Sequence, residues 1–210
     1  MGYSPEKFSS LPVKSETKKQ LRINNSRKVI GYIGRYETMG VEKGIFQLLK
    51  VGSILKKQLP ITVLLVGGPE SFAQKYHEYA KELGYKPDEI VIHPQVSPQE
   101  VPQYIAACDI GWLVYPDNPR FRNAISPMKV LEYAAAKVPI ITSNFPSITT
   151  QFPEKYLNVV ESDDTTAQVN TIKDMMQNKN TDIKTDELFN YIQQFSWIKR
   201  QEKILTFMKK

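Results

Sequence analysis

Two patterns of apolar residues alternate along the chain. Short runs that are apolar throughout and rich in β-branched side chains are typical of buried strands, and segments with apolar residues every three to four positions are typical of helices. Such alternation predicts βαβ units, so we expect an α/β fold: a Rossmann-like open parallel sheet with helices on both faces. The predicted strands are 29–35, 61–68, 90–93, 109–116, 139–143 and 156–160. The predicted helices are 41–59, 71–83, 98–107, one beginning at 126, and two or three within 165–208.

The predicted fold places a ligand site at one edge of the sheet. In open parallel sheets, ligands bind in the crevice at the carboxyl ends of the strands, where the strand order changes direction. The loop after the first predicted strand contains Gly34, Arg35, Lys43 and Gly44, and the loop after the fourth is PDNPRFRNAISP at 116–127. We expect both loops to lie at this edge.

The stretch SPMKVLEYAAAKVPII at 126–141 indicates what the edge could bind. Ser126 is a favoured N-cap and Pro127 a favoured first helical residue, so we predict a helix whose free N–H groups face the crevice and can bind an anion. Arg35 supplies a planar fork of donors and Lys43 a mobile point charge, two common ways of holding phosphate. Glu132 could accept hydrogen bonds from two neighbouring hydroxyls, as on a ribose. Together these residues indicate a sugar nucleotide or another nucleoside diphosphate.

Each of these features also has a purely structural explanation. Lys129 and Glu132 stand three residues apart and could form a surface ion pair worth about 0.2–0.5 kcal/mol. Arg35 and Lys43 could be solvated loop charges, and Ser-Pro begins many helices that bind no ligand. A binding site is favoured because all of these residues are expected at one edge of the sheet.

Composition narrows the class of partner. The 210 residues carry 28 Lys+Arg against 22 Asp+Glu, and the net charge of +6 favours an anionic partner such as nucleic acid, an acidic membrane surface or a phosphorylated small molecule. We find no basic stripe interleaved with aromatic residues, so we expect no nucleic-acid partner. Without a long apolar run or a leader-like start, we expect a cytoplasmic protein, with peripheral association at the inner face of the membrane as an alternative.

The sequence lacks the motifs of dinucleotide-binding sites, P-loops and metal sites. The first loop does not read G-x-G-x-x-G, and no G-x-x-x-x-G-K-[ST] occurs. The single cysteine, Cys108, lies in the run AACDIGW and is interpreted as a core residue, which excludes an internal disulfide and a thiolate metal cluster. His77 and His93 are not spaced as metal ligands, and we interpret RFR at 120–122 as a solvated loop rather than a base-stacking element.

Five segments, in this order, resemble motifs of the C-terminal, donor-binding domain of retaining GT-B glycosyltransferases of the family 4 group, the glycosyl transferases group 1. The resemblance covers nearly the whole chain. The family motifs are G-[VI]-D-x-x-x-F, a G-R…K-G loop, V-G-x-G-P, S-P-x-K-x-x-E-Y-M-A-x-G-x-P-[VI] and F-S-W-x-x-x-x-x-x-x-L. The similar segments here are GYSPEKF at 2–8, GYIGRYETMGVEKGI at 31–45, LLVGGP at 64–69, SPMKVLEYAAAKVPII at 126–141 and FSWIKRQEKIL at 195–205.

The resemblance implies the donor half of a hexosyltransferase-type enzyme that moves a sugar from a UDP-, GDP- or ADP-linked donor to an acceptor. It assigns Arg35 and Lys43 to the diphosphate as catalytic groups, Glu132 to the ribose hydroxyls and the segment 93–96 to the base. It also implies that no cofactor and no bound metal are needed, because arginine, lysine and a helix end neutralise the departing nucleotide. The donor-binding residues that it implies are Gly34, Arg35, Lys43, Val96, Ser126, Pro127, Met128, Lys129 and Glu132.

Departures from the family pattern leave some assignments open. Ala124 stands where the family has a second glutamate, eight residues before Glu132, so the contacts to the transferred sugar are open. The loop from Arg35 to Lys43 is longer than usual, which leaves the reach of Lys43 open. Lys137 replaces the glycine that usually follows the helix, so the helix end could differ. The alternative function is a non-catalytic nucleotide-binding or partner-binding module with the same fold.

We predict three parts along the chain: residues 1–27 as an interdomain linker and lead-in, 28–180 as the nucleotide-sugar-binding domain, and 181–210 as C-terminal helices. A GT-B enzyme also needs an N-terminal acceptor domain, so we expect that domain as a partner and the isolated chain to be inactive. The last helix should pack on the domain or on the acceptor domain, the alternative being a basic amphipathic membrane anchor. Its apolar side chains are Phe195, Trp197, Ile198, Leu205 and Met208.

Overall fold

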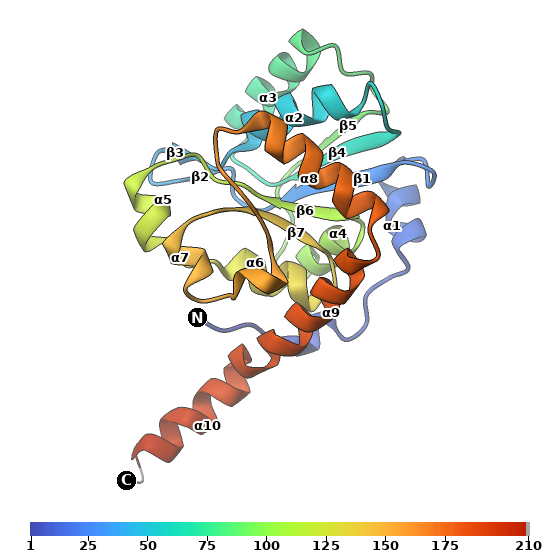
Figure 1. Ribbon diagram of the computed structural model, residues 1–210. Helices are drawn as coiled ribbons and strands as arrows, with labels where there is room; N and C mark the ends of the chain where they lie inside the picture. The colour runs from blue at the N-terminus through green and yellow to red at the C-terminus, as the bar shows by residue number, and fades with distance from the viewer. Residues whose placement is uncertain (209–210) are drawn as a thin grey trace.

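The computed structural model describes residues 1–208, and its centre is a six-stranded parallel sheet with helices on both faces (Figure 1). The sheet strands are β1 (Lys28–Ile33), β4 (Ile61–Val66), β5 (Ile90–His93), β6 (Ile110–Leu113), β7 (Ile140–Ser143) and β8 (Asn158–Val160), and a separate pair is β2 (Glu37–Thr38) and β3 (Val41–Glu42). The α-helices are α1 (Lys14–Gln20), α2 (Ile45–Leu55), α3 (Glu70–Glu82), α4 (Val101–Ala106), α5 (Pro119–Ala124), α6 (Met128–Ala135), α7 (Pro146–Thr149), α8 (Thr165–Gln177), α9 (Asn180–Ile192) and α10 (Trp197–Met208). The 3-10 turns are η1 (Pro5–Phe8), η2 (Glu154–Tyr156) and η3 (Gln193–Phe195). The predicted Rossmann-like α/β fold is confirmed.

The order of the strands creates a crevice at the carboxyl edge of the sheet. The order is β5-β4-β1-β6-β7-β8, and every neighbouring pair is parallel. The chain runs outward from β1 through β4 to β5 and then returns to the opposite side of β1 with β6, so the direction reverses between β1 and β6. The loops that follow β1 and β6 therefore flank the crevice in which such sheets bind ligands.

The sheet is buried because helices cover both of its faces. Helix α2 contacts both α3 and α8 on one side, and α4 contacts α1 and α6 on the other. Trp112 of β6 is fully buried, and its indole N–H donates a hydrogen bond to the carbonyl of Gly44, at a distance of 3.0 Å. Cys108 is buried, as predicted, and burial raises the pKa of its thiol to about 12, so it is an inert core residue.

The loop after β1 contains a small hairpin that the sequence did not predict. Strands β2 and β3 pair in antiparallel fashion, and the two residues between them, Met39 and Gly40, have φ values of 54° and 77°, which suits a type I′ turn. The prediction of a helix from Val41 was wrong, because α2 begins at Ile45. Gly44 precedes α2 with φ 82°, in the left-handed region, so the helix cannot extend back through it.

The lead-in segment packs on the domain. Lys14 and Lys18 of α1 contact the carboxylate of Asp109, at 3.1 and 2.9 Å, directly before β6. The boundary at residue 28 stays a prediction, but residues 14–20 are ordered against the fold rather than extended between domains.

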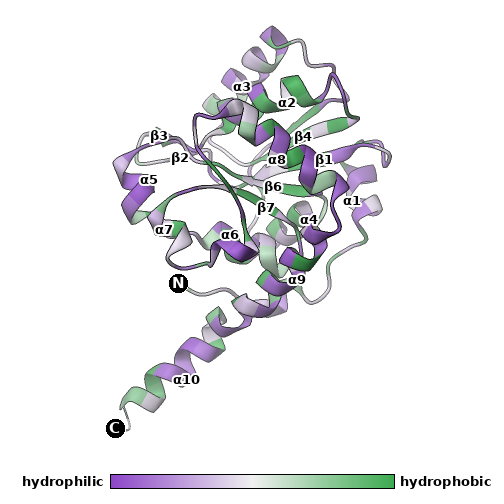
Figure 2. Cartoon of the chain, in the orientation of Figure 1, coloured by the Kyte–Doolittle hydropathy of each residue, from purple (hydrophilic) through white to green (hydrophobic). Residues whose placement is uncertain are grey.

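Helix α10 projects away from the rest of the domain (Figure 1), with a hydrophilic stretch along its middle and hydrophobic residues toward its C-terminal end (Figure 2). Phe195, just before it, packs on Phe152 with ring centroids 5.7 Å apart, as predicted. Ile198, Leu205 and Met208 are 62%, 57% and 75% exposed, so of the two predicted alternatives they do not follow packing on this domain. Packing on an acceptor domain stays a prediction. No helix within residues 1–208 is both long enough and apolar enough to cross a bilayer.

Candidate functional site

A pocket of about 490 Å³ lies between the loops that follow β1 and β6, and we call it the α5–α6 pocket. The two loops therefore meet at one edge, as predicted. The charged side chains in its wall are Lys43, Arg120 and Lys129, and the described residues that line it include no carboxylate. Ser126 and Met128 also contribute, so four of the predicted site residues share this wall. The pocket is basic and suits an anionic ligand.

Lys43 is the cation most affected by its surroundings. It follows the hairpin and is partly buried, and its backbone N–H donates to the carbonyl of Tyr36 at 3.0 Å. Burial lowers the pKa of its ammonium group to about 8, and the positive charges of Lys129 and Arg35 contribute to this decrease. Arg35 is exposed and lies outside the lining of the pocket, but close enough to influence Lys43. These cations are therefore gathered against their mutual repulsion, and a bound anion would relieve that repulsion.

Glu42 closes the N-terminus of α2, a role that the sequence analysis missed. Its carboxylate accepts hydrogen bonds from the backbone N–H groups of Gly44 and Ile45, at 2.7 and 2.5 Å, and from the hydroxyl of Tyr76, at 3.0 Å. Burial raises the pKa of Glu42, although these hydrogen bonds oppose the effect. The signal was present, since an acidic residue three positions before an apolar helix is a common N-terminal partner. The carboxylate of Glu42 thus occupies the N-terminus of α2, which leaves that helix end unavailable to an anionic ligand. The same hydrogen bonds fix the backbone on both sides of Lys43.

Lys129 and Glu132 form the ion pair that the structural explanation predicted. Lys129 Nζ lies 2.6 Å from Glu132 Oε2, and their side chains are 20% and 28% exposed. Lys129 also crosses Gly34, whose φ is 146°; a Cβ placed on Gly34 would come within 2.6 Å of Lys129 Cε. Within residues 1–208, Glu132 Oε1 has no hydrogen-bond partner. The pair therefore fixes Lys129 beside the crevice and leaves one carboxylate oxygen of Glu132 available.

The start of α6 differs from the prediction. The helix begins at Met128, and Ser126 does not cap it, because Pro127 lies outside the helical region at φ −81°, ψ 54°. The N–H of Met128 instead donates to the carbonyl of Ser126 at 2.8 Å, and the N–H of Val130 donates to the carbonyl of Pro127 at 3.0 Å. Among the described residues, the N–H of Lys129 has no backbone acceptor. The expected row of free amides is therefore reduced to that of Lys129.

A smaller pocket of about 180 Å³ lies on the other side of Met128 and Lys129, and we call it the α4–α6 pocket. It contains Glu132, so the side chain predicted to bind the ribose lies outside the α5–α6 pocket. Met128 and Lys129 of α6 line both pockets and separate them. Pro98 and Val101 form part of its wall, just after the segment predicted to hold the base. Val96 lines neither pocket.

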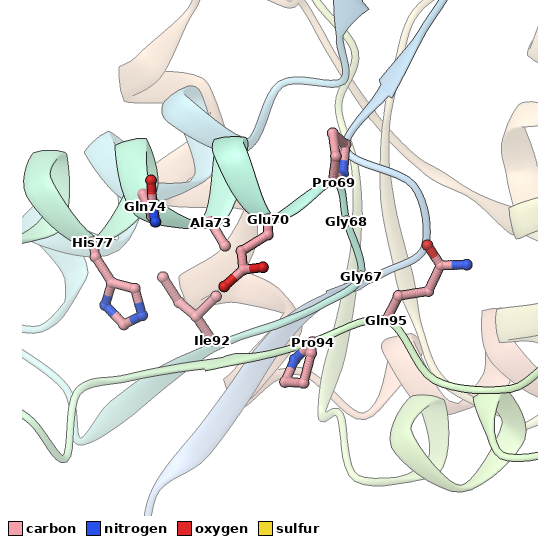
Figure 3. A pocket seen from close by; sticks show the side chains of 10 residues that line it. All are labelled: Gly67, Gly68, Pro69, Glu70, Ala73, Gln74, His77, Ile92, Pro94 and Gln95. Carbon is pink, nitrogen blue, oxygen red and sulfur yellow. The ribbon is translucent and has the colours of Figure 1, made fainter.

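A third pocket, of about 500 Å³, lies between α3 and the ends of β4 and β5 (Figure 3). Glu70 and His77 line it from α3, and Pro94 and Gln95 line it from the predicted base segment. None of the described residues in its wall is a lysine or an arginine. This pocket therefore does not suit a diphosphate. His93, also in the predicted base segment, lies beside Tyr104, with Nε2 and the hydroxyl oxygen 3.4 Å apart.

The two arginines of the 120–122 segment have different surroundings. Arg122 donates to Asp117 at 2.8 Å and is exposed at the surface, as predicted. Arg120 lines the α5–α6 pocket, and its guanidinium donates to the carbonyl of Met39 at 3.4 Å. Phe121 between them is 2% exposed, which leaves it no free face on which to stack a base. The interpretation of this segment as a loop was wrong, because residues 119–124 form α5. The two arginines are solvent-accessible, as expected, but the position of Arg120 at the pocket was missed.

Two further features bear on the predicted site. Ala124, which replaces the family glutamate, lies in the wall of the α5–α6 pocket. Lys137 keeps the left-handed conformation usual for a glycine, with φ 54°, and the N–H of Val138 donates to the carbonyl of Tyr133 at 3.0 Å, so the helix end is conserved in form. Within residues 1–208, no group of three or more His, Cys, Asp or Glu side chains could hold a metal ion.

Comparison with known proteins gives consistent matches. The profile of the glycosyl transferases group 1 family matches residues 13–195. A teichuronic acid biosynthesis glycosyltransferase of Bacillus subtilis, TuaH, is 31% identical over 137 residues, which are 64% of this chain and 31% of that protein. The matched region thus spans about a third of the curated relative.

Solved structures show the same fold. Anabaena Alr3699/HepE, solved with UDP-glucose, matches 99% of this chain and 56% of its own, with a TM-score of 0.79 and 15% identity. The C-terminal domain of a glycosyl transferase group 1 family protein, LpcC, from Francisella tularensis matches 91% of this chain and 97% of its own, with a TM-score of 0.71 and 16% identity. Since the family profile covers most of its length, this chain belongs to the glycosyl transferases group 1 family.

Proposed function

We propose that this chain binds the diphosphate of a nucleotide sugar in the α5–α6 pocket, as the donor half of a retaining glycosyltransferase. The observation that carries the proposal is the cation cluster at this edge. Lys43 and Arg35 have no salt-bridge partner within residues 1–208, and they stand near Lys129 closely enough to depress the pKa of Lys43. Folding would not favour such a cluster unless an anion joined it.

The proposed reaction replaces the bond between the anomeric carbon of the sugar and the diphosphate oxygen with a bond to an acceptor hydroxyl oxygen. Negative charge develops on the leaving diphosphate oxygen, which takes up the proton that the acceptor hydroxyl loses. Arg35 and Lys43 would stabilise that charge by electrostatic attraction, and the N–H of Lys129 would add a hydrogen bond. Glu132 would accept ribose hydroxyls through Oε1 while Oε2 stays on Lys129. We expect no bound metal, since these groups can neutralise the nucleotide. The solved Anabaena relative holds UDP-glucose, which supports a nucleotide sugar as the ligand.

We further propose that the acceptor binds to a second domain facing the carboxyl edge of the sheet. This chain covers 56% of the Anabaena protein, so the relative contains substantial additional structure. Residues 1–210 alone should then bind donor but transfer no sugar. Ala124 favours a second candidate, a binding module without catalysis, because it removes a carboxylate from the pocket. Adding an acceptor domain separates the two: restored transfer supports the enzyme, and unchanged inactivity supports the module.

The direct test is calorimetric titration of residues 1–210 with UDP, GDP and ADP. We expect one of them to bind, and Lys43→Gln to weaken that binding about ten- to a hundredfold, because a charge-assisted hydrogen bond to phosphate is lost. Lys50→Gln is the matched control, since Lys50 is an exposed lysine of α2 away from the pocket. Absence of binding by all three nucleotides, or equal effects of the two substitutions, would overturn the proposal.

A further inference from the structure

We infer that the sugar of the donor carries a carboxylate, as in a hexuronic acid, and that Arg120 recognises it. This inference rests on the proposed function, because it concerns the part of the same pocket that lies beyond the diphosphate. It identifies a specificity-determining residue, Arg120, and a class of donor, the acidic nucleotide sugars.

The charges around the pocket exceed what a diphosphate needs. A nucleotide sugar carries two negative phosphate charges, which Arg35 and Lys43 can match. Lys129 is already paired with Glu132 at 2.6 Å. Arg120 then remains as a positive charge in the pocket wall, without a salt-bridge partner within residues 1–208. A third negative charge on the ligand would balance it.

The local geometry presents Arg120 to the pocket. Its backbone N–H donates to Asn118 Oδ1 at 2.9 Å, which fixes the start of α5. One nitrogen of its guanidinium reaches the carbonyl of Met39 across the pocket, at 3.4 Å, so the side chain bridges α5 and the tip of the β2–β3 hairpin. Most of its N–H groups stay available, and a planar guanidinium matches a carboxylate in a two-pronged hydrogen bond. Arg122, only two residues on, is instead satisfied by Asp117.

The part of the wall formed by α5 favours a carboxylate beside Arg120, while the hydroxyls of Thr38, Tyr115 and Ser126 elsewhere in the wall can serve the sugar hydroxyls of either donor. Next to Arg120 the wall contains Phe121, Ala124 and Ile125, whose side chains accept no hydrogen bonds. A glutamate at Ala124 would both fill space and repel a carboxylate. With alanine there, the pocket keeps its positive potential and has room for the carboxylate of the sugar.

The test compares two donors that differ only in this carboxylate. We expect residues 1–210 to bind UDP-glucuronate about ten- to a hundredfold more tightly than UDP-glucose by calorimetry, since one charge-assisted interaction distinguishes them. Arg120→Gln should abolish the preference between the two donors, whereas the matched control Arg122→Gln should keep it. If GDP or ADP is the nucleotide bound, the pairs are GDP-mannuronate with GDP-mannose, or ADP-glucuronate with ADP-glucose.

The outcomes separate this inference from the proposed function. Equal binding of the acidic and neutral donors would overturn the inference while the proposed function stands. A preference that survives in Arg120→Gln would overturn the role of Arg120. Failure of UDP, GDP and ADP alike to bind would overturn the proposed function, and the inference with it. Circular dichroism of each variant checks that the fold is retained.

Discussion

Basic side chains gather at both edges of the sheet, but in the part of the chain that the structure describes, those at the amino edge surround a carboxylate and those at the carboxyl edge do not. At the amino edge, Lys14, Lys18 and Lys28 surround Asp109, with N···O distances of 3.1, 2.9 and 3.8 Å. At the carboxyl edge, Lys43 and Arg120 line one pocket and Arg35 lies near Lys43, and none of the three has a salt-bridge partner within residues 1–208. The cations of the first edge hold the fold together, and those of the second are left for a ligand.

The pKa values reflect the same contrast. Burial alone would raise the pKa of Asp109, but Lys14, the backbone N–H of Val29 and Lys18 outweigh it and hold that pKa below its usual value. Burial and neighbouring cations lower the pKa of Lys43. Charged forms are thus favoured by the folded state at the amino edge and opposed by it at the carboxyl edge. Functional sites often keep such unfavourable arrangements at a cost in stability.

The largest expected effect is a loss of stability when the carboxylate at the amino edge is removed. Asp109→Ala should lower the free energy of unfolding by about 3–5 kcal/mol, because it leaves the buried ammonium of Lys18 without its counter-charge. Urea denaturation measures the change. Asp117→Ala, which removes the exposed partner of Arg122, is the control and should cost at most about 1 kcal/mol. Similar losses in both variants would show that the two edges do not differ in the way described.

The next effect tests the carboxyl edge. Glu132→Ala should weaken nucleoside diphosphate binding about ten- to a hundredfold, because it removes charge-assisted hydrogen bonds to the ribose. Calorimetry measures the affinity, and the fold should survive. The matched control is Glu202→Ala, since Glu202 pairs with Lys199 at the same i,i+3 spacing, at 2.9 Å, on the exposed helix α10. If Glu132→Ala binds every nucleotide as the parent does, the ribose role is wrong.

A change of pH should sharpen the comparison. Lys43 has a pKa of about 8 in the free protein, so it is protonated below that pH and loses its charge as the pH rises through it. Affinity for a nucleotide sugar should therefore be steady up to about pH 7 and fall roughly tenfold by about pH 9. Lys43→Arg should remove the dependence, because arginine keeps its charge. A nucleotide sugar is the proper probe, since its phosphates do not titrate in this range. An unchanged affinity at pH 9 in the parent would contradict the assignment.

The smallest effect concerns a lysine of the amino edge whose partner is exposed. Lys137 contacts Asp186 at 2.8 Å, and both side chains are more than half exposed. Lys137→Gly should raise the free energy of unfolding by about 0.5 kcal/mol, because glycine relieves the left-handed backbone while the lost surface pair contributes little. Thermal denaturation would detect this small gain. A clear loss would mean that exposed pairs also hold this edge together.

The sheet could be predicted from the sequence because it depends on local patterns. The runs that form β1 and β4 are apolar throughout, and burial on both faces requires such runs. The β2–β3 hairpin could not be found in this way, since its strands are two residues long and carry no periodicity. Ser126 had the right residue type for a cap, but the conformation of Pro127 displaced the helix start.

The candidate site was predicted only in part, because pairing between side chains depends on the tertiary structure. Arg120 and Arg122 look alike in sequence, yet one lines the pocket and the other pairs with Asp117. The periodicity of α10 shows that the helix has an apolar face, but periodicity does not reveal what covers that face. Residue type and spacing identified Lys43 and Lys129 as candidates. Only the tertiary structure shows that Lys129 has an ion-pair partner and that Lys43 has none within residues 1–208.

The N-terminal segment pairs with the chain where α10 begins, which gives the domain a weak point under mechanical load. Tyr3 pairs with Ser196: the N–H of Tyr3 donates to the carbonyl of Phe195 at 3.2 Å, and the N–H of Trp197 donates to the carbonyl of Tyr3 at 3.0 Å. The indole of Trp197 lies against Gly2. The guanidinium of Arg200 also donates to the carbonyl of Met1 at 3.2 Å. A force that pulls residue 1 away from α10 would first strain these three hydrogen bonds and the ring contact. The terminal segments would therefore peel away as a low-force step before the six-stranded sheet carries any tension.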